Sequence, residues 1–136
     1  MIEPTREACE RLIVLLAQYS STVSRAMAKV APAPDLVGPG PITVLSVLDL
    51  EGPSRPGHLQ RVTGLSSGGV SKMLDRLSEA KLIRRAYGVV PGDNRGVLVS
   101  ITPQGRRLVR STAAELGRHF PETTILLKEV LALTSQ

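Results

Sequence analysis

Apolar residues recur along this chain with the spacing of helices in some segments and of strands in others. Between residues 66 and 77 they fall at i, i+3, i+4 and i+7, which predicts a helix with one buried face. The apolar positions are Val70, Met73, Leu74 and Leu77. The opposite face carries short or charged side chains: Ser67, Gly68, Ser71, Lys72 and Asp75. Such a segment is either an ordinary amphipathic helix or one whose outer face approaches another molecule closely.

Longer helical patterns lie at both ends of the chain. Residues 4–30 predict one helix with an apolar stripe consisting of Cys9, Leu12, Ile13, Leu16, Tyr19, Val23, Met27 and Val30. Residues 103–118 and 122–134 predict two more, with Thr102 as N-cap and Pro103 at the first helical position. These helices carry more apolar surface than one small domain covers. We expect them to form a dimerisation layer; the alternative is that they complete the core of a monomer.

The middle of the chain predicts two further helices before the one at 66–77. Prolines and glycines break the chain over residues 32–41, and an apolar helix over 41–50 is expected to lie in the core. A short helix over 56–62 is followed by a turn at Thr63-Gly64, and Ser66 is placed to cap the next helix. Two short helices around a glycine-containing turn are typical of a helix-turn-helix.

Two strands follow these helices. Residues 82–90 and 95–101 predict a hairpin around the turn residues 91–94. In the second strand Val97, Val99 and Ile101 alternate with Leu98 and Ser100, so the first three are expected to point inward. A hairpin packed after a helix-turn-helix is a wing. The expected fold is therefore mainly α with a small β-hairpin wing, in a single winged-helix domain over residues 1–136.

Basic residues are concentrated in the middle of the chain. The net charge of the 136 residues is +5, but residues 52–110 hold eleven Lys or Arg and only three Asp or Glu, a net +8. This asymmetry favours a polyanion as the partner of the middle segment and a different role for the ends. We therefore expect residues 41–102 to be a DNA-binding lobe, and residues 1–30 and 103–136 to be dimerisation helices.

Other classes of protein find little support. The sequence shows no nucleophile with a base, no phosphate loop and no paired carboxylates, so we expect no enzyme. His58 and His119 are isolated, and no metal or cofactor is expected. No apolar run is long enough for a membrane span, and a single cysteine fits the cytoplasm. Because Cys9 lies on the apolar stripe near Glu7 and Glu10, a buried structural cysteine is favoured over a redox sensor.

Three stretches in register resemble the MarR family of winged-helix transcriptional regulators. They are residues 55–66, residues 70–77 with 81–85, and residues 93–105, which include an Asp-x-Arg and a Thr-x-x-Gly. The resemblance implies a homodimer that binds a pseudo-palindromic double-stranded DNA operator, usually as a repressor. It also implies that a small-molecule effector, or in some members an oxidant, relieves DNA binding from a site between the dimerisation helices and the DNA-binding lobe. The proline- and glycine-rich loop 32–41 departs from the family pattern there, so no effector identity carries over.

The candidate DNA-binding residues follow from the helix at 66–77 and from the wing. Ser66, Ser67, Gly68, Ser71 and Lys72 are candidates for groove contacts, with capping as the alternative role of Ser66. Arg76 is either a phosphate contact or an ion-pair partner of Glu79. Adjacent strand residues face opposite ways, so at most one of Arg84 and Arg85 faces the duplex. The glycines at 68 and 69 indicate either close approach to DNA or a loose helix start.

The wing supplies the last two candidates. Arg95 is expected to enter the minor groove, where negative potential is concentrated. Asp93 is expected to hold Arg95 or the turn backbone, because a carboxylate is repelled by phosphates. The alternative is a solvated hairpin tip.

Two other functions compete with a duplex-binding regulator. The first is a winged-helix protein-interaction module without DNA binding, which has no need of a +8 segment. The second is single-stranded nucleic-acid binding, which relies on aromatic stacking. Of the aromatic residues only Tyr87 lies in the basic segment, too little for a stacking platform.

Overall fold

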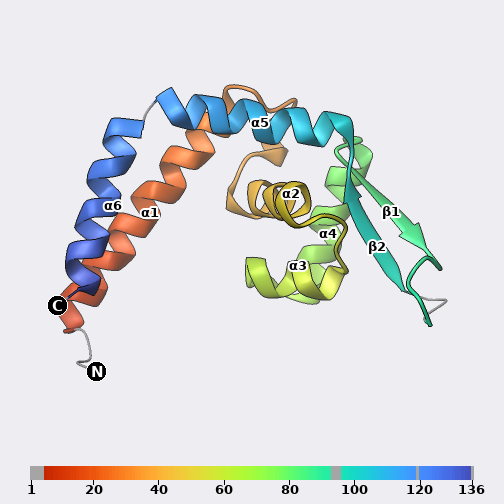
Figure 1. Ribbon diagram of the computed structural model, residues 1–136, viewed down its shortest axis with the longest axis horizontal. Coiled ribbons are helices and arrows are strands. Elements are labelled where there is room, and N and C mark those ends of the chain that lie inside the picture. Colours follow the sequence, from red (N-terminus) through yellow and green to blue (C-terminus); the bar gives the residue numbers. More distant parts are fainter. Residues whose placement is uncertain (1–4, 93–95, 119, 136) are drawn as a thin grey trace.

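The computed structural model describes residues 5–92, 96–118 and 120–135, and it is built mainly of α-helices (Figure 1). The elements in order are α1 (Arg6–Ala28), the 3-10 turn η1 (Pro34–Leu36), α2 (Pro39–Glu51), α3 (Pro56–Thr63), α4 (Ser67–Glu79), β1 (Ile83–Tyr87), β2 (Val97–Ile101), α5 (Pro103–Arg118) and α6 (Phe120–Thr134). The prediction of a mainly α fold with one β-hairpin is confirmed.

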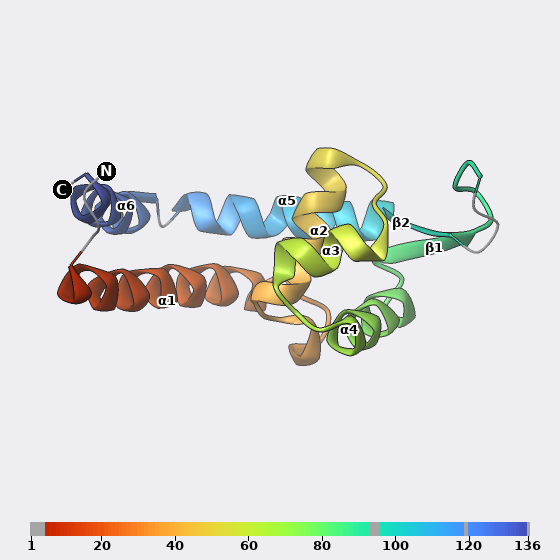
Figure 2. The ribbon, with the colours of Figure 1, turned by 90° about the horizontal axis from the view of Figure 1, so that it is seen from below.

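The elements separate into two regions that we call the arm and the lobe. In the arm, α1 and α6 run side by side, and the start of α1 and the end of α6 lie at its tip (Figure 1). The lobe contains α2, α3, α4 and the hairpin, and α5 extends from the lobe to the arm (Figures 1 and 2). No described helix is long and apolar enough to cross a membrane.

One hydrophobic core fills the lobe. As predicted, α2 lies within it, and Val44, Leu45 and Leu48 are at most 1% exposed. Met27 from the end of α1 and Leu108 from α5 belong to the same core, so the arm helices are anchored in the lobe at their inner ends. The expectation that α2 is buried on most sides does not hold at its last turn, where Leu50 is 84% exposed.

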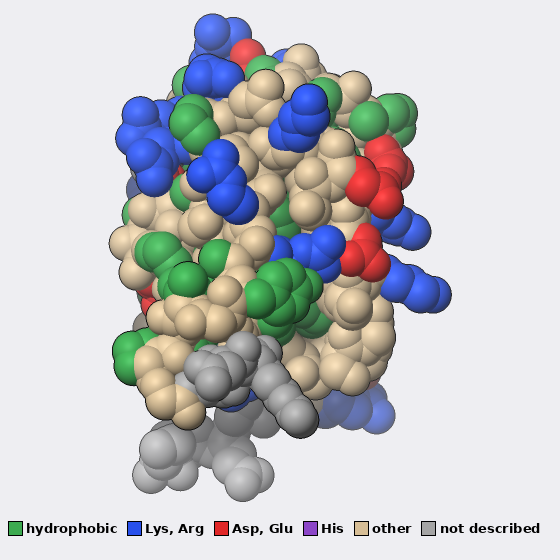
Figure 3. Space-filling model, turned by 90° about the vertical axis from the view of Figure 1, so that its right-hand side faces the viewer, with side chains coloured by type: hydrophobic (Ala, Val, Ile, Leu, Met, Phe, Trp, Pro, Cys, Tyr) green, Lys and Arg blue, Asp and Glu red, His purple; other side chains and the backbone are tan. Residues whose placement is uncertain are grey.

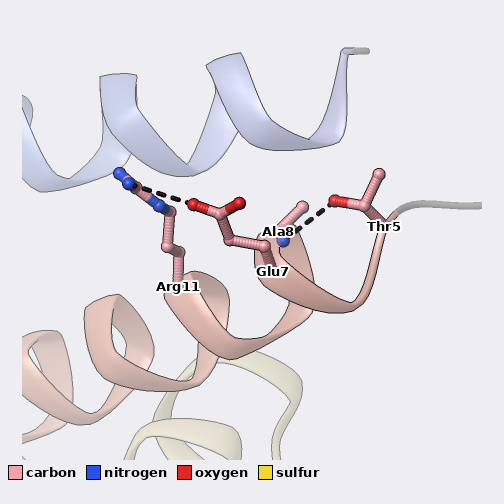
Figure 4. Close-up of polar contacts among 4 residues, drawn as sticks. All are labelled: Thr5, Glu7, Ala8 and Arg11. Carbon is pink, nitrogen blue, oxygen red and sulfur yellow. Dashed lines mark hydrogen bonds and ion pairs between the residues drawn. The ribbon is translucent and has the colours of Figure 1, made fainter.

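The arm leaves much of α1 uncovered. Its N-terminus is capped by Thr5, whose side chain accepts a hydrogen bond from the Ala8 amide at 3.1 Å, and Glu7 pairs with Arg11 at 3.3 Å (Figure 4). Ala8 and Leu15, one face of the helix, are buried. Cys9 is exposed, so its predicted burial is wrong for the single chain. Position 9 lies about 100° around the helix from position 8, outside the face that is covered.

The hairpin is joined to the lobe on both sides. β1 and β2 are antiparallel, with Ile83 opposite Ile101 and Arg85 opposite Val99. Val99 is fully buried and also exchanges two backbone hydrogen bonds, of 2.8 and 2.9 Å, with Ser54. Val97 and Ile101 pack against the core, which confirms the predicted inward face of β2.

Thr102 joins three segments at the base of the hairpin: the end of β2, the connection from α4 to β1, and the start of α5. Its hydroxyl donates to the Lys81 carbonyl at 2.7 Å and accepts from the Gly105 amide at 3.1 Å, as predicted for an N-cap. Its own amide donates to the Leu82 carbonyl at 3.0 Å. A Cβ on Gly105 would overlap that Leu82 carbonyl. The Thr-x-x-Gly sequence therefore reflects close packing of α5 against the start of β1.

Several boundaries differ from the prediction for local reasons. α2 begins at Pro39 rather than residue 41, because the amides of a first helical turn need no intrahelical partner and tolerate proline. β1 ends at Tyr87, where Gly88 takes a φ of 72°.

Candidate nucleic-acid interface

The helix-turn-helix is formed by α3 and α4. α3 ends at Thr63, and the next residue, Gly64, takes a left-handed conformation with φ 71°, which suits glycine. α4 begins one residue after Ser66, whose hydroxyl accepts a hydrogen bond from the Gly69 amide at 3.0 Å. The predicted cap is confirmed. Ser66 is also exposed, so capping leaves its other side open to a ligand.

α4 has one buried and one exposed face, as its sequence predicts. Val70, Met73, Leu74 and Leu77 are all at most 8% exposed. The predicted groove residues lie on the exposed side, namely Ser67, Gly68, Ser71, Lys72 and Arg76. A Cβ at Gly68 would meet no atom within 4 Å, so the fold itself does not require glycine at this position.

The two arginines of β1 face opposite sides of the hairpin. Arg84 is exposed and lines a cleft with Lys81 and Gln104. The Arg85 side chain is only 26% exposed and pairs with Asp75 of α4, with the Arg85 Nη1 atom 2.7 Å from the carboxylate. Among the described residues, Arg76 makes no ion pair with Glu79, which leaves the Arg76 guanidinium available on the surface of α4.

A hollow that the sequence analysis missed lies between α3, α4 and the hairpin. It measures about 210 Å³. Gly57 and Gln60 line it from α3, Ser67 and Ser71 from α4, and Tyr87 from β1. One signal was available: residues 83, 85 and 87 alternate in phase with the buried Ile83, so Tyr87 belongs to the face of β1 that meets α4.

Cations predominate at the hairpin end of the molecule. Viewed from that end, Lys and Arg side chains gather over the surface and outnumber the acidic ones (Figure 3). Two of the arginines in the basic segment are held in ion pairs with carboxylates, Arg85 with Asp75 and Arg106 with Asp49. Asp93 and Arg95, the predicted tip residues of the wing, lie outside the described residues, and their roles stay predictions.

Solved structures with this arrangement of helices and hairpin are numerous. A mutant of MarR from E. coli complexed with operator DNA has a TM-score of 0.72 at 23% identity, over 93% of this chain and 88% of that chain. Wild-type apo MarR from E. coli has a TM-score of 0.71 at 23% identity, over 99% of this chain and 94% of that one. The chain has the MarR fold.

RV1404 from Mycobacterium tuberculosis shows the same likeness over nearly full length. Its TM-score is 0.72 at 20% identity, over 99% of this chain and 96% of that chain. No family model matches the sequence, and no curated protein matches it. The MarR fold therefore rests on the structure: α4 is its second helix-turn-helix element, and β1 and β2 are its wing.

Proposed function

We propose that this chain is a sequence-specific double-stranded DNA-binding transcriptional regulator. The observation that carries the proposal is the division of α4: its apolar face is packed against the core, while its other face presents small polar residues and two cations, Lys72 and Arg76, that form no ion pair with any described carboxylate. Ser67 and Ser71 permit close approach, and Lys72 reaches a base edge or a phosphate. We assign groove contacts to Ser66, Ser67, Gly68, Ser71 and Lys72, and a phosphate contact to Arg76.

The likeness to a MarR structure complexed with operator DNA supports this proposal. The net +8 of residues 52–110 supports it independently, because binding to phosphates releases counterions and is favoured by clustered cations.

The proposed regulator is a homodimer formed by the arm. Ile13, Val14 and Leu16 on α1, and Ile125, Leu127 and Leu131 on α6, are between 44% and 68% exposed. A cleft of about 580 Å³ with Val14, Leu15 and Leu133 in its lining separates the two helices near the tip of the arm. A second copy of the chain offers matching apolar helices to this surface. Two copies would present two α4 helices to the two half-sites of a pseudo-palindromic operator.

A cleft at the junction of arm and lobe is a suitable place for the effector. It measures about 320 Å³ and is lined by Val30 and Pro32 after α1, by Leu82, and by Leu108 and Arg107 of α5. Apolar walls with the Arg107 guanidinium suit a small ligand that has an apolar body and one anionic group. A ligand that changes the angle between arm and lobe would change the spacing of the two α4 helices. We infer that the protein represses until such a ligand releases it from DNA.

A salt titration tests the function. The protein is titrated with duplex DNA from upstream of its own gene, and with random duplex, at several salt concentrations. We expect tighter binding to the upstream duplex and a steep fall of log affinity with log salt concentration. A lack of preference at every salt concentration would rule out a sequence-specific regulator and favour the protein-interaction module. A reporter downstream of the bound sequence, with and without the protein, gives the sign of regulation: repression lowers its expression.

A further inference from the structure

The ion pair between α4 and β1 has a role that neither the sequence nor the fold assigns. We propose that the Asp75–Arg85 pair fixes the angle between the recognition helix α4 and the wing, and that Arg85 is a positioning residue rather than a DNA contact. This inference rests on the proposed function for its effect on DNA binding, but not for its effect on the free protein.

Arg85 is placed to hold the middle of the hairpin against α4. It lies at the centre of β1 opposite Val99, the residue through which the hairpin is bonded to Ser54. Its side chain lies on the α4 side of the hairpin and lines the hollow with Ser71 and Leu74. With 26% of the side chain exposed and Nη1 2.7 Å from Asp75, this guanidinium is already occupied.

Asp75 stands where a carboxylate should weaken DNA binding. It is one helical turn beyond Ser71 on the exposed face of α4, and 55% of its side chain is exposed. Phosphates repel an unpaired carboxylate at such a position, so an acidic residue there needs a compensating role. The contact with Arg85 neutralises the negative charge of Asp75 and gives this carboxylate a structural role between α4 and β1.

α4 and β1 are also joined by the backbone connection at Lys81-Leu82 and by the core at the base of the hairpin, to which Leu77 and Ile83 belong. In the described part of the chain, the Asp75–Arg85 pair is the one ion pair that joins α4 to the hairpin. It closes a loop across ten residues, between the helix that enters the major groove and the strand that leads to the wing. We expect the hairpin to be held less firmly against α4 when this pair is removed, although its base stays bonded to Ser54.

The test depends on the sign of the effect of Asp75→Asn. If Asp75 were merely a surface acid, removing its charge would tighten duplex binding, and freeing Arg85 would add a cation. If the pair positions the wing, Asp75→Asn weakens binding, and we expect a loss of about fivefold or more for a dimer with both half-sites affected. Arg85→Gln is expected to weaken binding to a similar degree, and the double variant no further.

Two exposed residues provide matched controls for the lost charges. Glu79→Gln removes an acid one turn along α4, and Arg110→Gln removes an exposed cation of α5. Binding is measured for all variants on the upstream duplex at one salt concentration. We expect Glu79→Gln to bind no more weakly than the wild type. Unchanged or tighter binding by Asp75→Asn would overturn the proposal.

Amide hydrogen exchange of the free protein separates this proposal from the proposed function. We expect faster exchange at residues 83–87 and 97–101 in Asp75→Asn and in Arg85→Gln, and wild-type exchange in both controls. This outcome supports the proposed positioning role of the Asp75–Arg85 pair even if the wild type binds no duplex. Unchanged exchange in both variants would overturn the proposed positioning role even if DNA binding fell, because Asp75 and Arg85 would then act at the DNA directly.

Discussion

At the scale of single residues, Lys81 occupies a position that usually belongs to glycine. It has a φ of 62°, just after the end of α4. The Lys81 amide bonds to the Ser78 carbonyl and the Leu82 amide to the Leu77 carbonyl, each at 2.9 Å. This is the hydrogen-bond pattern of a Schellman motif, in which the left-handed residue disfavours a side chain.

Replacing this lysine should therefore stabilise the protein. We expect Lys81→Gly to raise the free energy of unfolding by about 1 kcal/mol, because glycine adopts the left-handed conformation without strain. Urea unfolding at a fixed protein concentration measures the change. The same replacement one residue earlier, Ala80→Gly, should lower stability, since φ there is −78°. A loss of stability in Lys81→Gly would mean that the lysine side chain contributes more than the strain costs.

Gly68 offers a second test at this scale. Because its Cβ position is open, Gly68→Ala is expected to stabilise the free protein by up to about 1 kcal/mol through helix propensity. If the glycine permits close approach to DNA, the same variant binds the upstream duplex more weakly. Thermal unfolding and a binding titration measure the two effects. Unchanged affinity would leave a loose helix start as the reason for the glycine.

At the scale of elements, the wing is expected to act through its tip. We predict that Arg95→Ala lowers duplex affinity about tenfold while leaving the dimer intact, because a cation in a narrow minor groove meets concentrated negative potential. Binding titration and sedimentation measure the two properties. An unchanged affinity would remove the wing tip from the mechanism.

Local sequence patterns predicted the elements well where the cause is local. The helical spacing of α4, its Ser66 cap and the Thr102 cap of α5 depend on residues within one or two turns, and all three are confirmed. The Asp75–Arg85 pair joins α4 to β1 across the short connection between them, and the hollow is lined by residues of α3, α4 and β1. Neither leaves a periodic signal, so the sequence predicted neither the pair nor the hollow.

The exposure of Cys9 also depends on contacts between elements that are distant in the sequence. Its position on the α1 stripe was visible in the sequence, but which face of α1 becomes covered depends on where α6 returns, more than a hundred residues later. Burial of an arm residue is therefore a property of the folded chain as a whole, and the proposed dimer would change it again.

At the scale of the whole molecule, the exposed arm predicts a dimer. We expect the protein to sediment at twice its chain mass of 14.5 kDa. Ile13→Glu should produce monomers, because it places a charge in the apolar surface of α1, where Ile13 is 68% exposed in the single chain. Leu50→Glu is the control, since Leu50 is 84% exposed in the lobe. Dimers that survive Ile13→Glu would place the interface elsewhere.

Because α1 is anchored in the lobe core at its inner end, a small change in its tilt moves its outer end by a larger distance. A helix of 23 residues is roughly 34 Å long, at 1.5 Å per residue. A tilt of about 5° at one end then moves the other by roughly 3 Å, nearly the 3.4 Å rise of one base pair. In the proposed dimer on DNA, a small change of tilt at the tip of the arm would shift α4 by about one base pair. We therefore expect substitutions in the arm to alter which operator lengths the protein accepts.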